Sequence, residues 1–125
     1  MKVSFDFDST LDNPVCQKLA KVLRNGGAEV FIITTRGENT NNRDVLEVAN
    51  DVGIPFRNIH FIGNKFKQSL VAKLGIDLHI DDGWDEVEKI RQGGGKAMLF
   101  NMNIFEIADG IQGCEDINEQ FLKDI

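Results

Sequence analysis

The sequence predicts an α/β fold, a single Rossmann-like, doubly wound parallel sheet with strand order 3-2-1-4-5. Short apolar runs alternate with amphipathic segments along residues 1–100. Such a β-α-β-α order requires right-handed crossovers and places helices on both faces of the sheet. At 125 residues the chain has the length of one domain. We therefore expect one domain over residues 1–125, with its core in 1–100 and a C-terminal extension over 101–125.

The first half of the chain is predicted to contain two strands and two helices. An apolar run opens the chain, and Pro14 after it suits the first turn of a helix. An apolar stripe at helical spacing follows, and glycines 26 and 27 end that helix. A second apolar run leads to another amphipathic stretch, which Gly53 closes. The predicted elements are a strand at Val3–Phe7, a helix from Pro14 to the glycine pair, a strand at Val30–Thr34 and a helix at Asn42–Val52.

The second half repeats this alternation with shorter elements. Gly75 ends one amphipathic segment, and the three glycines at 93–95 form a turn that leads to the last strand. The predicted strands are Ile59–Ile62, Leu78–Ile80 and Ala97–Phe100, and the predicted helices are Lys67–Leu74, Trp84–Arg91 and, in the extension, Asp116–Lys123.

Composition and charge narrow the classes of function. The formal net charge of −6 counts against a large polyanionic partner, because duplex binding needs a basic face. Cys16 and Cys114 have neither CxxC spacing nor a histidine cluster, so we expect reduced, structural thiols. No signal peptide precedes the first strand, and no apolar run approaches the ~18 residues of a membrane span. We expect a cytoplasmic protein with no membrane partner.

Polar residues follow three of the predicted strands at the point where each strand ends. In a doubly wound sheet, ligands bind beyond the carboxyl ends of the strands, beside the central strand. The helix that leads into strand 4 also begins at this edge. The topology therefore brings together Asp6 and Asp8 at the end of strand 1, Thr34 at the end of strand 2 with Thr35 and Arg36 after it, Lys67 at the helix start, and Asp81 and Asp82 after strand 4.

The two aspartates after the first strand predict a metal site. Alternate residues of a strand share a face, so Asp6 and Asp8 are expected to crowd two carboxylates at the edge of an apolar core. An unpaired buried ion costs several kcal/mol. A divalent cation removes this cost, because hard metals bind carboxylate oxygens.

The order and spacing of these motifs resemble the haloacid dehalogenase superfamily of phosphatases. The stretch DFDSTL at 6–11 is similar to the first motif of that superfamily, Thr34 to the second, Lys67 to the third and the Asp81-Asp82 pair to the fourth. The resemblance spans residues 1 to about 100 and includes all four motifs in order.

The resemblance implies a Mg²⁺-dependent phosphomonoester hydrolase that works through an aspartyl-phosphate. Asp6 is then the nucleophile, and Asp8 is the general acid and base. Thr34 and Lys67 hold the transferring phosphoryl group. The implied Mg²⁺ ligands are Asp6, the backbone carbonyl of Asp8, and Asp81 or Asp82.

Three further residues are candidate substrate contacts. Thr35 and Arg36 begin the polar loop after strand 2, and Arg36 is well placed to meet a substrate phosphate. Lys65 is the alternative to Lys67 as the phosphate-binding lysine. Lys73 is a weaker alternative, because it lies nearly two helical turns later, roughly 9 Å along the axis.

The chain leaves no room for the cap domain that many members of this superfamily carry. Only 25 residues separate Asp8 from Thr34, and 32 separate Thr34 from Lys67; predicted helices and strands fill both intervals. An open site suits a bulky phosphorylated substrate such as a nucleic-acid end or a phosphoprotein, and a nucleotide is a further candidate.

The stretch 35–38 and the Asp81-Asp82 pair resemble the 3′-phosphatase domain of polynucleotide kinase, and small nucleotidases are similar too.

Two other functions share this architecture. A signalling receiver needs an acceptor aspartate after strand 3 and a lysine after strand 5, where this chain has Gly63-Asn64 and Asn101. A catalytically silent phosphate- or metal-binding module of the same fold remains the alternative.

Several of these residues also have a purely structural interpretation. Taken alone, Asp81-Asp82 is typical of a helix cap, and a threonine that closes a strand is usually a turn residue. His60 and His79 fall within strands, and we expect both to be structural.

Overall fold

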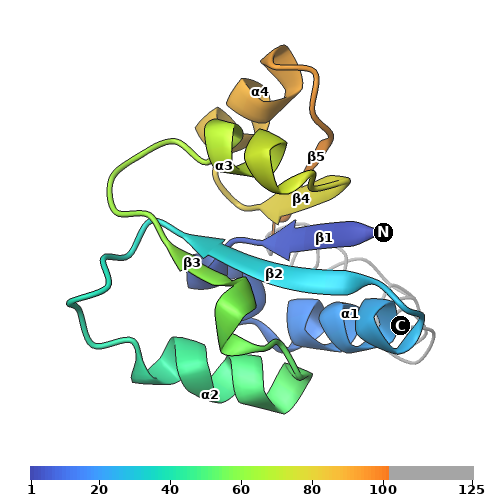
Figure 1. Ribbon diagram of the computed structural model, residues 1–125, viewed down its shortest axis with the longest axis vertical. Coiled ribbons are helices and arrows are strands. Elements are labelled where there is room, and N and C mark those ends of the chain that lie inside the picture. The colour runs from blue at the N-terminus through green and yellow to red at the C-terminus, as the bar shows by residue number, and fades with distance from the viewer. Residues whose placement is uncertain (102–125) are drawn as a thin grey trace, which may run out of the picture.

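The computed structural model describes residues 1–101, and its sheet confirms the predicted fold class. Five parallel strands lie in the order β3-β2-β1-β4-β5, with β1 in the centre (Figure 1). The strands are β1 (Lys2–Phe5), β2 (Glu29–Thr34), β3 (Ile59–Phe61), β4 (Leu78–Asp81) and β5 (Ala97–Leu99).

Four helices cover the two faces of this sheet. In Figure 1, α1 and α2 lie on one side and α3 and α4 on the other. Their bounds are α1 (Pro14–Asn25), α2 (Arg43–Val52), α3 (Gln68–Leu74) and α4 (Trp84–Gln92), with short turns η1 (Phe7–Leu11) and η2 (Phe56–Asn58) between elements. Cys114 and the helix predicted at Asp116–Lys123 lie outside the described residues.

The helix ends follow from local chemistry. The side chain of Asn13 accepts a hydrogen bond from the backbone nitrogen of Val15 at 2.9 Å, which satisfies one of the free N–H groups at the start of α1. Gly75 ends α3 with a φ of 68°, a left-handed conformation that glycine adopts at little cost. The predicted bounds hold to within one residue over residues 1–101, except that β1 ends at Phe5, two residues before the predicted Phe7.

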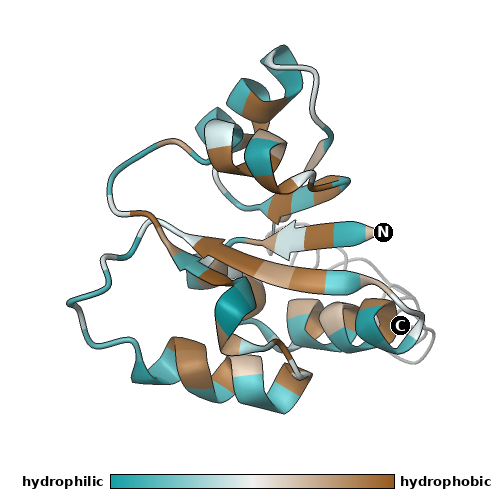
Figure 2. Cartoon of the chain, viewed as in Figure 1, coloured by the Kyte–Doolittle hydropathy of each residue, from teal (hydrophilic) through white to brown (hydrophobic). Residues whose placement is uncertain are grey.

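Buried apolar side chains lie on both faces of the sheet, and strand β2 is mostly brown in Figure 2. Val3, Phe5 and Ile32 pack with α1 and α2, whereas Phe31 and Ile33 pack with the α3–α4 layer. This alternation is the ordinary period of two along a strand. Burial of each such side chain contributes roughly 1.5–3 kcal/mol.

A buried polar row interrupts the second face. Ser4, His79 and Asp81 alternate in their strands with Val3, Phe5 and Ile80, which belong to the α1–α2 core. By the same period of two, the polar side chains point toward α3 and α4. All three are almost fully buried, so each needs a hydrogen-bonding partner there.

The connections between strands are short throughout residues 1–101. Only η1 and α1 lie between β1 and β2, and only α2 and η2 between β2 and β3. The predicted absence of a cap domain is therefore confirmed for this part of the chain. None of its helices combines the length and apolar character that a membrane span requires.

Candidate functional site

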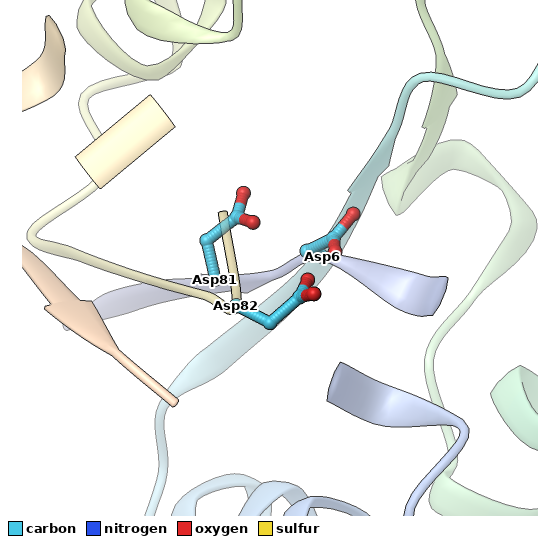
Figure 3. Close-up of side chains that lie close together, drawn as sticks. All are labelled: Asp6, Asp81 and Asp82. Carbon is cyan, nitrogen blue, oxygen red and sulfur yellow. The ribbon is translucent and has the colours of Figure 1, made fainter. Parts of the chain in front are cut away.

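Three carboxylates meet at the carboxyl ends of β1 and β4. Asp6 follows β1, Asp81 ends β4 and Asp82 comes next, and one oxygen of each lies within 4.8 Å of the others (Figure 3). The two strands are paired neighbours, and the backbone nitrogen of Asp6 donates to the Ile80 carbonyl at 2.9 Å. Asp6 and Asp81 are buried, while Asp82 is exposed.

Lys67 is the cation of this cluster. Its Nζ lies 2.7 Å from Asp6 Oδ1 and 2.7 Å from Asp81 Oδ2, and only 2% of the side chain is exposed. Its backbone nitrogen donates to Glu86 Oε2 of α4 at 3.0 Å. Lys65 is exposed and lines a separate hollow beside Lys73. Of the three candidate lysines, the structure therefore places Lys67 among the aspartates.

A buried histidine is hydrogen-bonded to one carboxylate of the cluster. His79 Nε2 lies 2.8 Å from Asp81 Oδ2, and its Nδ1 lies 2.7 Å from Ser4 Oγ. Burial lowers the pKa of His79 despite the hydrogen bond to Asp81, so the ring is neutral at pH 7. Since an ionised carboxylate only accepts, Nε2 carries the hydrogen and Ser4 donates to Nδ1.

From the sequence, His79 is expected to be only a structural residue of a strand. The structure adds a direct bond from His79 to a candidate site carboxylate. The available signal was the spacing of two between His79 and Asp81, which puts both side chains on one face of a strand.

Asp81 and Asp82 have different surroundings. Asp81 Oδ2 accepts from Lys67 and His79, and its Oδ1 accepts from the Gly83 backbone nitrogen at 2.9 Å. Burial opposes the ionised form, but the hydrogen bond from His79 and the charge of Lys67 hold the pKa of Asp81 below its usual value. Asp82 accepts a longer bond, from Thr10 Oγ1 at 3.2 Å. Asp82 is therefore the better placed of the two to bind a metal ion.

The electrostatics of the cluster favour a bound cation. Three carboxylates face the single ammonium of Lys67. Burial, aided by the nearby Asp82 and Asp81 and opposed by Lys67, raises the pKa of Asp6 to about 8. A set of carboxylate oxygens fits a hard divalent ion such as Mg²⁺, and such an ion offsets the excess negative charge.

Asp8 lies outside the cluster because η1 redirects the chain. In this turn Leu11 N donates to Asp6 O, and Asp12 N donates to Phe7 O, both at 3.1 Å. Ser9 takes a left-handed conformation, with φ 62°. The Asp8 side chain is exposed and pairs with Arg36 at 2.7 Å.

The expected crowding of Asp6 and Asp8 on one strand face is therefore wrong. The strand ends at Phe5, and each carboxylate has a different cation, Lys67 for Asp6 and Arg36 for Asp8. A metal contact through the Asp8 backbone carbonyl stays a prediction.

The last residue of β2 and the two residues after it lie in distinct environments. Thr34 is buried at the end of the strand, and its Oγ1 accepts from the Arg36 backbone nitrogen at 3.2 Å. A hydroxyl that accepts one bond keeps its own hydrogen for donation. Thr35 is exposed, and the Arg36 guanidinium bonds Asp8 and Asp44.

A hollow of about 510 Å³ opens beside the cluster. Asp82, Ser9 and Phe100 are among the residues that line it. A larger hollow of about 860 Å³ lies between α2 and β3, and none of the clustered aspartates lines it. The clustered charged residues and the largest of these hollows thus lie in different places. The charged residues, and not the size of a hollow, define the candidate site.

Comparisons with known proteins show the fold of this chain but neither its family nor its activity. No family model matches the sequence, and no curated protein matches it. Among solved structures the chain is similar to an uncharacterized protein from Corynebacterium glutamicum ATCC 13032 Kitasato, with a TM-score of 0.61 and 13% sequence identity. The match covers 90% of this chain and 96% of that chain. Membership of the haloacid dehalogenase superfamily therefore stays a prediction.

Proposed function

We propose that this chain is a Mg²⁺-dependent phosphomonoester hydrolase of the haloacid dehalogenase type, with Asp6 as its nucleophile. The observation that supports this most directly is the buried contact of Asp6 with Lys67 at 2.7 Å, beside two further carboxylates. A carboxylate paired with a fixed cation at the carboxyl edge of a doubly wound sheet suits phosphoryl transfer, which needs mainly positioning and charge neutralisation.

In the proposed reaction a carboxylate oxygen of Asp6 attacks phosphorus, and the bond from phosphorus to the leaving oxygen breaks. Asp8 gives its proton to that oxygen. Asp8 then takes a proton from water, whose oxygen attacks the aspartyl-phosphate and releases Asp6 and inorganic phosphate. Lys67 and the Thr34 hydroxyl hold the oxygens of the transferring group, which carry its negative charge.

Asp6 and Asp82 would hold the metal ion, with the Asp8 backbone carbonyl as a further predicted ligand. Bound Mg²⁺ supplies positive charge against the acidic cluster and the phosphoryl oxygens. Asp81 keeps Lys67 in place through the 2.7 Å ion pair.

The test is hydrolysis of p-nitrophenyl phosphate with and without Mg²⁺. We expect turnover in the wild type that EDTA abolishes and that Asp6→Asn removes. Asp51→Asn removes the same charge from the exposed face of α2 and should leave turnover unchanged. Full activity in Asp6→Asn would rule out the nucleophile, and tight binding of Mg²⁺ and phosphate without turnover would favour the silent binding module.

The substrate class is tested by a screen. Without an inserted cap domain in residues 1–101, we expect the site to admit bulky substrates. Release of phosphate from nucleotides, 3′-phosphorylated oligonucleotides and phosphopeptides, compared with release from sugar phosphates, will measure this preference. A strict preference for the small sugar phosphates would contradict an open site.

A further inference from the structure

The guanidinium of Arg36 joins two carboxylates that lie 36 residues apart in sequence. Its Nε and Nη2 donate to the two oxygens of Asp8 at 3.0 and 2.7 Å. Its Nη1 and Nη2 donate to the two oxygens of Asp44 at 2.7 and 2.8 Å. The group also lies over the buried ring of Phe7, with 5.0 Å from its central carbon to the ring centroid. The Arg36 guanidinium is therefore held by three contacts, with Asp8, Asp44 and the Phe7 ring.

The Asp44 side of this arrangement is anchored in α2. Asp44 is in the first turn of the helix, and its Oδ1 also accepts from the Val45 backbone nitrogen at 2.9 Å. A carboxylate is stabilised at a helix N-terminus, and the hydrogen bond from Arg36 lowers the pKa of Asp44 further. Asp44 is as exposed as Asp8, at 56% of its side chain, but the bond from Val45 gives it a support that is independent of Arg36.

The loop between β2 and α2 is held in the same way. The Gly37 carbonyl accepts from Thr40 Oγ1 at 2.8 Å and from Asn42 Nδ2 at 3.0 Å. The Arg36 backbone nitrogen donates to Thr34 Oγ1. Both the backbone and the side chain of Arg36 are therefore tied to neighbouring elements.

Asp8 lacks such support of its own. It lies on η1, where its backbone and that of Ser9 depart from helical values, and 54% of its side chain is exposed. An exposed aspartate side chain ordinarily samples several rotamers. A bidentate bond from a guanidinium fixes the plane of a carboxylate as well as its distance.

We propose that Arg36 is a positioning residue that fixes the carboxylate of Asp8 and that Asp44 in turn fixes Arg36. This inference rests on the proposed function, in which Asp8 is the acid and base. It differs from the substrate contact expected from the sequence, because the donors of Arg36 already bond two carboxylates. These bonds use four of the five guanidinium hydrogens, so a phosphate bound by a pair of Arg36 donors would have to displace a carboxylate.

The test compares Arg36→Ala and Arg36→Lys with Arg43→Ala. Arg43 is a matched control, because it pairs with Glu47 on α2 at 3.0 Å and is 85% exposed. We expect Arg36→Ala to lower kcat for p-nitrophenyl phosphate by about 10–100-fold and to change KM by less than about threefold. Arg36→Lys should restore part of kcat, because an ammonium pairs with Asp8 without the bidentate geometry.

A double mutant separates positioning from substrate binding. If Arg36 acts through Asp8, Arg36→Ala costs nothing further in the Asp8→Asn background. An additive loss in that background, or a raised KM with kcat unchanged, would overturn the inference.

A structural readout keeps the inference testable if the wild type turns nothing over, a result that would reject the proposed function alone. Crystal structures of wild type and Arg36→Ala then report the Asp8 carboxylate directly. We expect one defined position in the wild type and several in the variant. An unchanged single position in Arg36→Ala would refute the positioning role whatever the activity.

Discussion

In the proposed reaction Asp6 must be an anion when it attacks phosphorus, yet its surroundings favour the neutral acid. Burial and the neighbouring carboxylates raise its pKa to about 8, even though Lys67 lies 2.7 Å away. A cation bound at the cluster reverses this balance, because a metal ion binds the deprotonated carboxylate. Metal binding and ionisation of Asp6 are therefore expected to be linked.

This linkage predicts a pH dependence of Mg²⁺ affinity. Below pH 8 Asp6 holds a proton that Mg²⁺ must displace, so affinity should rise with pH by up to about tenfold per unit and level off above about pH 8. Isothermal titration calorimetry in buffers of different ionisation enthalpy will count the released proton. In Asp6→Asn the pH dependence should disappear, and affinity that is flat in the wild type between pH 6 and 8 would contradict the linkage.

Asp81 and Asp82 are adjacent in sequence but should respond differently to substitution. Asp81→Asn leaves the buried Lys67 with a weaker partner, so we expect a loss of about 3 kcal/mol in the free energy of unfolding. Asp82→Asn changes an exposed group and should alter stability by less than about 0.5 kcal/mol, while it weakens Mg²⁺ binding. Urea unfolding and Mg²⁺ titration of both variants will measure the two effects. Equal stability losses would show that the two carboxylates share one role.

Among the elements, η1 has the largest influence on the site. It ends β1 at Phe5 and turns Asp8 toward Arg36, while Asp6 stays with Lys67. The left-handed Ser9 makes this possible, although a residue with a side chain adopts that conformation at some cost. Local strain at a turn is a common way to position a neighbouring side chain, which here is that of Asp8.

The short helix α3 depends on the glycine that ends it. Gly75 has a φ of 68°, and an added Cβ would meet no atom within 4 Å. Gly75→Ala should therefore lower the free energy of unfolding by about 1–2 kcal/mol through backbone conformation alone, and Gly75→Asn by less. Gly37 has equally open surroundings without a positive φ, so Gly37→Ala is the matched control and should be nearly neutral. Chemical denaturation will compare the three variants, and a neutral Gly75→Ala would refute the conformational explanation.

At the scale of the whole molecule, the sheet could be predicted from the sequence because its signals are local. Apolar runs that alternate with amphipathic segments predict the strand order, and that order alone brings Asp6, Lys67 and Asp81 to one edge. The contact of Lys67 rather than Lys65 with the aspartates also agrees with its place at the start of a helix.

The pairing of individual charges could not be predicted in the same way. The Asp8–Arg36–Asp44 arrangement depends on η1 and on a left-handed serine, and no sequence pattern signals either feature. The bonds of His79 to Ser4 and Asp81 depend on the register between β1 and β4, which pairs Ser4 with His79. Registers of this kind are decided by packing of the whole sheet.

The surplus of negative charge in the cluster makes a prediction for the stability of the whole molecule. An ion that binds only the folded state adds about 2.7 kcal/mol when its concentration is about 100 times its Kd. Mg²⁺ should therefore raise the thermal midpoint by several degrees, and EDTA should reverse the shift. NaCl at matched ionic strength is the control, because general screening acts on the net charge of −6 without a specific site. Asp82→Asn should lose the Mg²⁺ shift and keep the NaCl response. Equal shifts with Mg²⁺ and NaCl in the wild type would mean that the ion acts by screening, and the acidic cluster would then hold no specific metal.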